Sequence, residues 1–313
     1  MKSLMLMALL CSSAFATQES LMRFTAPKGT VSDYKSETSL DIKSTLVSLK
    51  SLDGKGLPQG LKEFVFENVS NKSLVNAEYR ETVLEQDPTT GARIKHTGWN
   101  RSSTGLLLGP RIGLDYTLHI SAQGQVKAQN IITKIIERGA LYDNLTSSSQ
   151  GSNLDKGLLE GQKISAFYDA LWTQTMLQPF ELGGRQPLRA TSEQLGQEAT
   201  SQGPQNIKLG EVKLLERTQS GGFRFAVDVD TARYAPELLA QTDSSYRVKQ
   251  FSRQTLEYGL DGRLIRSSGT STSVLQRPTE TREFRGRKFE VVTALVTTSS
   301  TTTVRSDADD KTP

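Results

Sequence analysis

The segment LEYGLDGRLIRSSGTSTSV, residues 256–274, decides the fold. It contains Gly259-Leu260-Asp261-Gly262 between two runs of strand-forming residues. Glycines in such a loop either approach a phosphate closely or supply the positive φ angle of a tight turn. Aspartate directly before Gly262 favours the turn, because Asp-Gly is a frequent hairpin pair. The segment therefore predicts two antiparallel strands that reverse direction at Gly262.

A second segment has the same pattern. TLHISAQGQV at 117–126 and TLEYGLDGRL at 255–264 share Thr, Leu and Gly 138 residues apart, and both end on an apolar residue. On this interpretation Gly124 and Gly262 turn the same hairpin, used twice. Three identities in ten positions also arise by chance, so an internal repeat and a coincidence both stay open. The repeat favours a protein with two similar halves.

The remaining pattern is that of an antiparallel β protein. Hydrophobic residues make up 35% of the chain, which suits sheets with one wet face better than buried parallel sheets. Alternation and β-branched residues predict a first β-rich half at 34–143 and a second at 207–305. We therefore expect an α+β fold, predominantly antiparallel β: a curved sheet or half-barrel of two similar halves with one central packing helix.

The middle of the chain, residues 144–206, differs from both halves. It begins with a polar linker at 144–153. Apolar residues then recur at helical spacing and Pro179 follows, which predicts a helix over 162–178. Residues 183–206 are rich in Gly, Gln, Pro and Ser, and we expect a flexible connection there.

The N-terminus has the pattern of a secretory signal peptide over 1–16. A positive start precedes an apolar run too short to span a bilayer, and the sequence AFA then matches a signal-peptidase site. We expect cleavage after Ala16 and export to the periplasm, the extracellular space or the cell envelope; lipidation of Cys11 is the alternative. A mature chain without cysteine forms no disulfides, which fits a bacterial envelope. An irregular lead-in at 17–33 and a charged tail at 306–313 complete the chain.

Few residues suit catalysis. The two histidines, His96 and His119, fall in predicted strands, and we interpret both as ordinary sheet residues. No nucleophile elbow, zinc-binding helix or phosphate-binding loop is present, and the aspartates of the tail lack the pattern of a calcium loop. We therefore predict no catalytic residue, no metal site and no cofactor. A formal charge of +4, spread along the chain, does not indicate nucleic-acid binding.

Two groups of residues are candidates for binding. The aromatic stripe of the predicted helix either lines an apolar ligand cavity or simply packs on the sheet; its members are Phe167, Tyr168, Leu171 and Trp172. A basic cluster near Phe284 and Phe289 either contacts an envelope protein or anionic polymer, or forms an exposed loop turning at Gly286; its members are Arg282, Arg285, Arg287 and Lys288.

The arrangement of a signal peptide, long antiparallel strands and one helix resembles the LolA-like half-barrel proteins of the bacterial envelope, over about 34–304. That resemblance implies a curved antiparallel sheet closed off by helices around an apolar cavity that carries lipid or lipoprotein. No motif supports the transfer of any residue role. We expect an exported, non-catalytic binding or carrier protein for an apolar or lipid ligand, without a transmembrane segment in the mature chain. A structural or protein-interaction module of the envelope is the alternative, and a hydrolase comes third.

Overall fold

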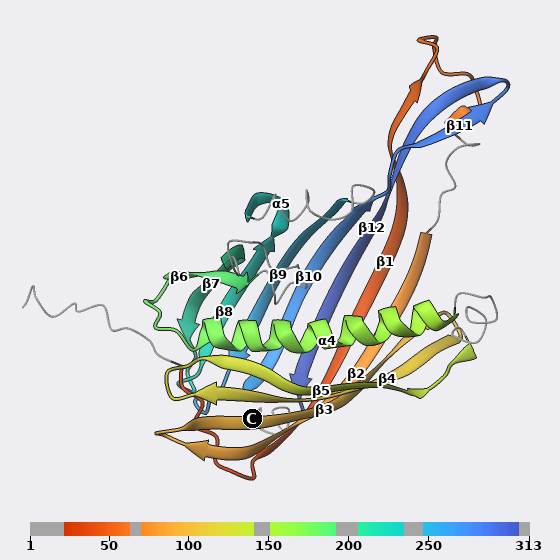
Figure 1. The fold of residues 1–313 in the computed structure, drawn as a ribbon. Coiled ribbons are helices and arrows are strands. Elements are labelled where there is room, and N and C mark those ends of the chain that lie inside the picture. The colour runs from red at the N-terminus through yellow and green to blue at the C-terminus, as the bar shows by residue number, and fades with distance from the viewer. Residues whose placement is uncertain (1–21, 63–69, 141–150, 192–205, 235–246, 307–313) are drawn as a thin grey trace, which may run out of the picture.

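The computed structural model describes residues 22–62, 70–140, 151–191, 206–234 and 247–306. Their strands form one curved, unclosed antiparallel sheet of 12 strands, and one long helix lies across it (Figure 1). This architecture confirms the predicted α+β fold with a single packing helix. The signal-peptide prediction lies outside the described residues.

The sheet consists of two meanders. The first contains β1 (Val31–Ser51), β2 (Ser70–Asp87), β3 (Gly91–Thr104), β4 (Leu107–Ser121) and β5 (Val126–Glu137). The second contains β6 (Arg185–Thr191), β7 (Asn206–Arg217), β8 (Phe223–Asp230), β9 (Arg247–Tyr258) and β10 (Leu264–Gln276), followed by β11 (Glu280–Phe284) and β12 (Arg287–Arg305). The strand order is β5-β4-β3-β2-β1-β12-β10-β9-β8-β7-β6, so β12 joins the two meanders by pairing with β1 and β10.

Alternation along the strands gives the sheet an inner and an outer face. We call inner the face that carries Tyr34, which is buried, and outer the opposite, solvated face. Hydroxyl groups pair across β1 and β12 on the inner face: Thr303 donates to Ser36 at 2.9 Å, and the Thr38 and Thr301 oxygens lie 2.9 Å apart. The low hydrophobic fraction of the chain thus reflects a sheet whose central strands are rich in Ser and Thr on both faces.

The two predicted hairpin corners are confirmed. Gly124 has φ 76° and Gly262 has φ 77°, a region that glycine adopts without strain. The Gly124 amide donates to the carbonyl of Ser121 at 2.9 Å, and the Gly262 amide donates to the carbonyl of Gly259 at 3.1 Å. The turns therefore share backbone geometry as well as sequence, and each joins the last two strands of its meander.

The long helix α4 (Gly151–Met176) connects β5 to β6, the two edge strands of the sheet, and packs against both (Figure 1). It therefore crosses the opening of the half-barrel. The helix ends close to the predicted limit but begins earlier than residue 162, because Gly157 and Gly161 are accommodated inside it. A second helix, α5 (Thr231–Tyr234), is a single turn. In the described part of the chain, no helix combines the length and apolar character needed to cross a membrane.

Two connections differ from their predictions. Residues 151–153, expected in a polar linker, belong to α4, and the rest of that linker lies outside the described residues. Residues 185–191, expected in a flexible connection, form β6, because Leu188 and Ala190 are buried in the core when this strand pairs with β7. The lead-in at 17–33 also contributes to the core through Met22.

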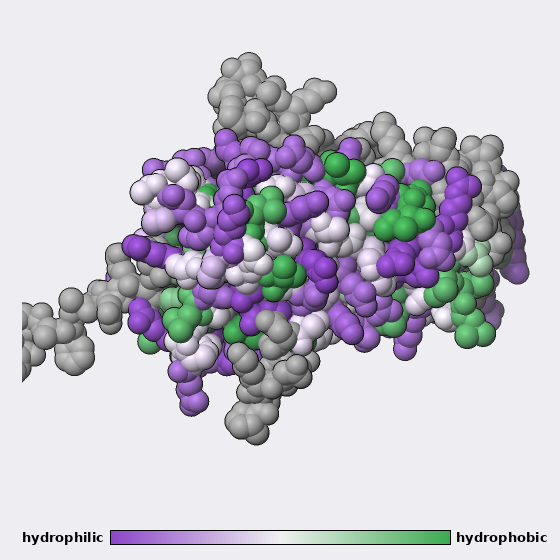
Figure 2. Space-filling view, turned by 90° about the horizontal axis from the view of Figure 1, so that it is seen from below, coloured by the Kyte–Doolittle hydropathy of each residue, from purple (hydrophilic) through white to green (hydrophobic). Residues whose placement is uncertain are grey.

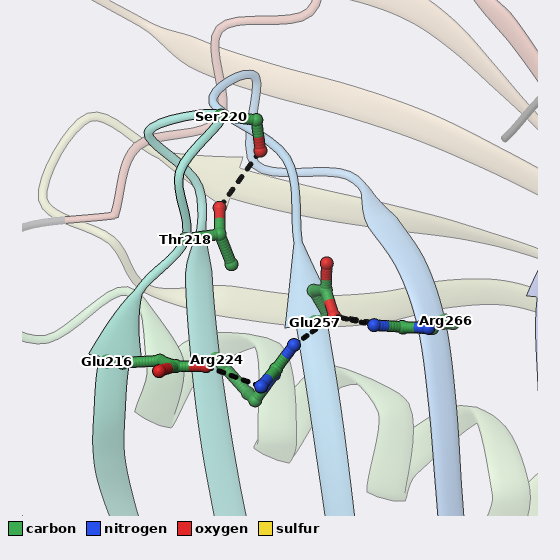
Figure 3. A network of polar contacts seen from close by, with 6 residues as sticks. All are labelled: Glu216, Thr218, Ser220, Arg224, Glu257 and Arg266. Atoms are coloured by element: carbon green, nitrogen blue, oxygen red, sulfur yellow. Dashed lines mark hydrogen bonds and ion pairs between the residues drawn. The ribbon is translucent and has the colours of Figure 1, made fainter. Parts of the chain in front are cut away.

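Charged residues cross the outer face in a row. Arg224 on β8 bonds to Glu216 on β7 and, at 3.1 Å, to Glu257 on β9. Glu257 in turn accepts from Arg266 on β10 at 2.9 Å (Figure 3). The face seen in Figure 2 is largely hydrophilic, with hydrophobic side chains in separate groups. The large core lies on the inner side, between the sheet and α4.

Candidate functional site

A cavity of about 210 Å³ lies between α4 and the inner face of the sheet. Among the helix side chains that the structure describes, Gln162, Asp169 and Thr173 line it. Opposite them, the sheet and the lead-in supply an apolar and aromatic wall that includes Phe24, Tyr79, Ile94, Leu114, Tyr116, Leu118, Tyr258 and Leu264. The cavity therefore combines an apolar wall with a small number of polar groups, as small-molecule sites in proteins do.

Two carboxyl groups and an imidazole meet in this cavity. The Nδ1 atom of His96 lies 3.7 Å from Oε1 of Glu81 and 3.9 Å from Oδ2 of Asp169. The side chains of His96 and Glu81 are only 7% and 14% exposed, whereas that of Asp169 is 38% exposed. Register brings the first two together, because Glu81 on β2 is the direct cross-strand partner of His96 on β3. Asp169 reaches them from α4.

Tyrosines hold both carboxyl groups in place. The hydroxyl of Tyr116 donates to Asp169 at 2.6 Å, and the hydroxyl of Tyr34 donates to Glu81 at 2.9 Å. The ring of Tyr116 also stacks on His96 with centroids 4.5 Å apart. The first hydrogen bond ties β4 to the helix, and the second ties β1 to β2 beside it.

Burial raises the pKa values of two groups in the cluster, Glu81 and Tyr116. It raises the pKa of Glu81 above its ordinary value, and the neighbouring His96 opposes this shift without reversing it. Burial likewise raises the pKa of Tyr116, with the Asp169 carboxylate adding to the effect. The Tyr116 hydroxyl therefore stays protonated at neutral pH and acts as a hydrogen-bond donor.

Arg263 is the one arginine among the described residues that line the cavity, and Asp261 compensates its charge. Its Nε donates to Asp261 at 2.7 Å, and a further hydrogen bond runs to the hydroxyl of Ser32. The Glu81 and Asp169 side chains thus give the cavity an excess of acidic groups. Among the residues that the structure describes, no group of three or more His, Cys, Asp or Glu is arranged to hold a metal ion.

The aromatic stripe predicted from the sequence lies beside this cavity rather than in its lining. Leu171 is buried in the core, and Tyr168 and Trp172 pack against that core. Phe167 is 38% exposed. The side chains that reach the cavity from α4 lie on another face of the helix.

The basic cluster lies at a separate place, a tip that projects from the far end of the sheet (Figure 1). A small apolar core there contains Leu61, Phe289 and Val291. The predicted turn at Gly286 is present, but it is flanked by the paired strands β11 and β12 rather than by an open loop, because Arg285 and Gly286 both adopt positive φ angles.

Each arginine of the cluster makes a contact within the tip. The Arg287 guanidinium donates to both oxygens of Asp53 at 2.8 Å. Arg282 pairs with Glu280 at 2.8 Å, and the Arg285 guanidinium lies 4.9 Å from the centroid of the Phe284 ring. Lys288 is exposed. The tip is therefore an ordered, basic hairpin.

The structure separates the two histidines, for which the sequence predicts the same role as ordinary sheet residues. His119 is half-buried on the outer face, with Leu118 and Ile120 buried on the inner face as alternation predicted. His96 points inward into the cavity lining. Alternation along the strand could have predicted this difference. His96 lies two residues after Ile94, which is buried, so the two side chains point to the same face of the sheet.

Comparison with known proteins gives no family for this chain: no protein-family model matches the sequence, and no curated protein matches it. The candidate site therefore rests on its own geometry. That geometry is a cavity between helix and sheet, walled by apolar and aromatic side chains, with a buried carboxyl–imidazole cluster at one place in the wall.

Proposed function

We propose that this protein is an exported, non-catalytic binding or carrier protein of the bacterial cell envelope, and that its ligand occupies the cavity between α4 and the inner face of the sheet. The ligand has an apolar part and a polar group. The cavity itself is the observation that carries this proposal, because its lining offers an apolar wall and a few fixed polar side chains together.

The arrangement of the polar groups suits holding a ligand. Tyr34 and Tyr116 fix the carboxyl groups of Glu81 and Asp169 by hydrogen bonds, so the polar groups are oriented before any ligand enters. Preorganised groups of this kind reduce the entropy lost on binding. The position of α4 across the opening of the half-barrel also supports the proposal, since the helix and the inner face of the sheet enclose the cavity between them.

An environment-sensitive apolar dye, N-phenyl-1-naphthylamine, tests the proposal. We expect saturable fluorescence enhancement with the folded protein, competed by short-chain amphiphiles. Ala77→Phe fills the cavity, because Ala77 lines it, and should abolish the enhancement. Asn76→Phe is the matched control, since Asn76 is adjacent and exposed. Equal enhancement with the two variants would show that the dye binds elsewhere.

A second candidate function is a protein-interaction module of the envelope that uses the basic tip. The tip projects from the sheet and its small core fixes the β11–β12 hairpin, so its cations are presented on an ordered surface (Figure 1). The double variant Arg285→Gln/Lys288→Gln should then lose a partner retained from envelope fractions, while the outer-face control Lys35→Gln keeps it. Retention of the same proteins by both variants would argue against this function.

A further inference from the structure

We infer that the cavity recognises an ammonium group, and that its ligand is an amphiphile with a protonated primary amine as its polar head. This inference rests on the proposed function and names the ligand class of the same site. It follows from three features of the cavity: its charge, one buried nitrogen of His96, and its aromatic walls.

The charge of the cavity favours a cation. Glu81 and Asp169 both lie near the Nδ1 atom of His96, at 3.7 Å and 3.9 Å from it. Arg263 supplies positive charge, but Asp261 already compensates it with an ion pair of 2.7 Å. An isolated carboxylate is costly to bury, and a cationic partner lowers that cost. Burial already raises the pKa of Glu81, and the neighbouring His96 and Arg263 oppose this shift without reversing it.

The imidazole adds a hydrogen-bond acceptor. Nδ1 of His96 faces the two carboxyl groups, and the proposed site requires the neutral ring with its proton on this atom. The other nitrogen, Nε2, is then an acceptor. The side chain of His96 is 93% buried and lines the cavity. Its Nε2 atom is buried and has no hydrogen-bond partner among the residues that the structure describes. An N–H group of a primary ammonium satisfies this acceptor, whereas a quaternary ammonium has no hydrogen to donate.

Aromatic rings complete the site. Tyr79, Tyr116 and Tyr258 all line the cavity, and cations are attracted to the faces of such rings. Tyr79 stacks on Tyr34 with centroids 4.6 Å apart, and Tyr116 stacks on His96, so both rings are held in fixed orientations. The apolar side chains Leu114 and Leu118 lie in the same lining and suit the alkyl chain of an amphiphile.

Four ligands that share an eight-carbon chain test the head group by isothermal titration calorimetry at pH 7.5: octylammonium, octyltrimethylammonium, octanol and octanoate. Ethylammonium, which lacks the chain, separates an amphiphile from a small free amine. We expect octylammonium to bind about tenfold more tightly than octanol, with octyltrimethylammonium between them and octanoate weakest. We expect no measurable binding of ethylammonium.

Asp169→Asn is the informative variant, because Asp169 is the most exposed member of the cluster and asparagine keeps its shape. We expect the ratio of the octylammonium and octanol affinities to shrink to about twofold in this variant. A cooperative thermal unfolding transition confirms that the variant is folded. The comparison of head groups uses the wild-type protein and does not depend on any variant.

Each other outcome overturns a defined part of the account. Equal binding of all four eight-carbon ligands, or a preference for octanoate, overturns the ammonium site and leaves the carrier function standing. Ethylammonium binding as tightly as octylammonium overturns the amphiphile and indicates a small amine. Binding of none of the ligands overturns both the ammonium site and the proposed function.

Discussion

The hydroxyl of Tyr116 donates a 2.6 Å hydrogen bond to the carboxylate of Asp169, and this contact joins the inner face of the sheet to the helix that crosses it. Tyr116 is buried, and its ring stacks on His96. The bond therefore links the geometry of the cavity to the position of α4. Its removal should affect both the stability of the fold and the shape of the site.

Tyr116→Phe removes this hydrogen bond and keeps the ring. We expect the free energy of unfolding to fall by about 1–2 kcal/mol, because a charged acceptor loses its donor while the packing is retained. Urea denaturation monitored by circular dichroism measures the change. Tyr79→Phe is the control, because the Tyr79 hydroxyl forms no hydrogen bond with the residues that the structure describes. This variant should change the urea midpoint of unfolding much less. Equal losses for the two variants would contradict a specific helix–sheet bond.

Glu81→Gln tests the cost of burying a carboxyl group in the cavity. The folded-state pKa of Glu81 is raised above its ordinary value of 4.5, so the wild-type protein loses stability as the pH rises through the folded-state pKa. Glutamine keeps the acceptor for Tyr34 and carries no charge. We expect the variant to match the wild type near pH 4 and to unfold at a higher temperature near pH 8.

The control for this prediction is Glu78→Gln, which changes an exposed carboxyl group on the outer face of the same strand. Its thermal midpoint relative to wild type should stay constant over the same pH range. A stability difference for Glu81→Gln that is independent of pH would show that the effect comes from packing rather than from ionisation.

Glu257→Gln tests the charged row of the outer face (Figure 3). Burial opposes ionisation of Glu257, but the hydrogen bonds from Arg224 and Arg266 outweigh it and lower the pKa of this carboxyl group below 4.5. A lowered pKa contributes stability above the unfolded-state pKa, and that stability is lost as the pH falls through the folded-state pKa.

We expect Glu257→Gln to cost about 1 kcal/mol at pH 7, since both arginines remain partly in water and their interactions are screened. The cost should shrink as the pH falls below 4.5 toward the lowered folded-state pKa, because the wild-type carboxyl group then becomes protonated too. Urea midpoints measured at pH 7 and pH 3 provide the comparison. An unchanged cost at pH 3 would rule out the ion pairs as its source.

Gly262→Ala and Gly286→Ala form a matched pair of turn substitutions. Both glycines have positive φ angles, 77° and 72°, so alanine costs about 1 kcal/mol at either position from backbone strain alone. A Cβ atom at Gly262 would also lie 2.6 Å from the carbonyl oxygen of Arg23, whereas one at Gly286 meets nothing within 4 Å.

The Gly262 substitution should therefore cost more, by about 1–2 kcal/mol in chemical denaturation. The additional loss comes from displacement of the lead-in, which packs against this corner and contributes Phe24 to the cavity wall. Equal losses in the free energy of unfolding for the two variants would mean that the lead-in moves aside for the new Cβ atom without a cost in stability.

The sequence predicted the sheet better than the site, for physical reasons. Turn glycines and alternation are local signals, so the corners at Gly124 and Gly262 were predictable. Strand β6 was not, because Pro187 and the surrounding Gly and Gln indicate a loop, and only pairing with β7 buries its apolar residues. The cluster of Glu81, His96 and Asp169 depends on strand register and on where α4 lies, neither of which a local pattern encodes.

Native mass spectrometry of the protein purified from cells that export it tests the central claim most directly. The account predicts a chain that begins after Ala16 and a wild-type population carrying a small amphiphile, which the cavity-filling Ala77→Phe variant lacks and the Asn76→Phe control keeps. A wild-type protein that carries no small molecule, or an adduct of equal mass and occupancy on Ala77→Phe, would contradict the claim that this cavity holds the ligand.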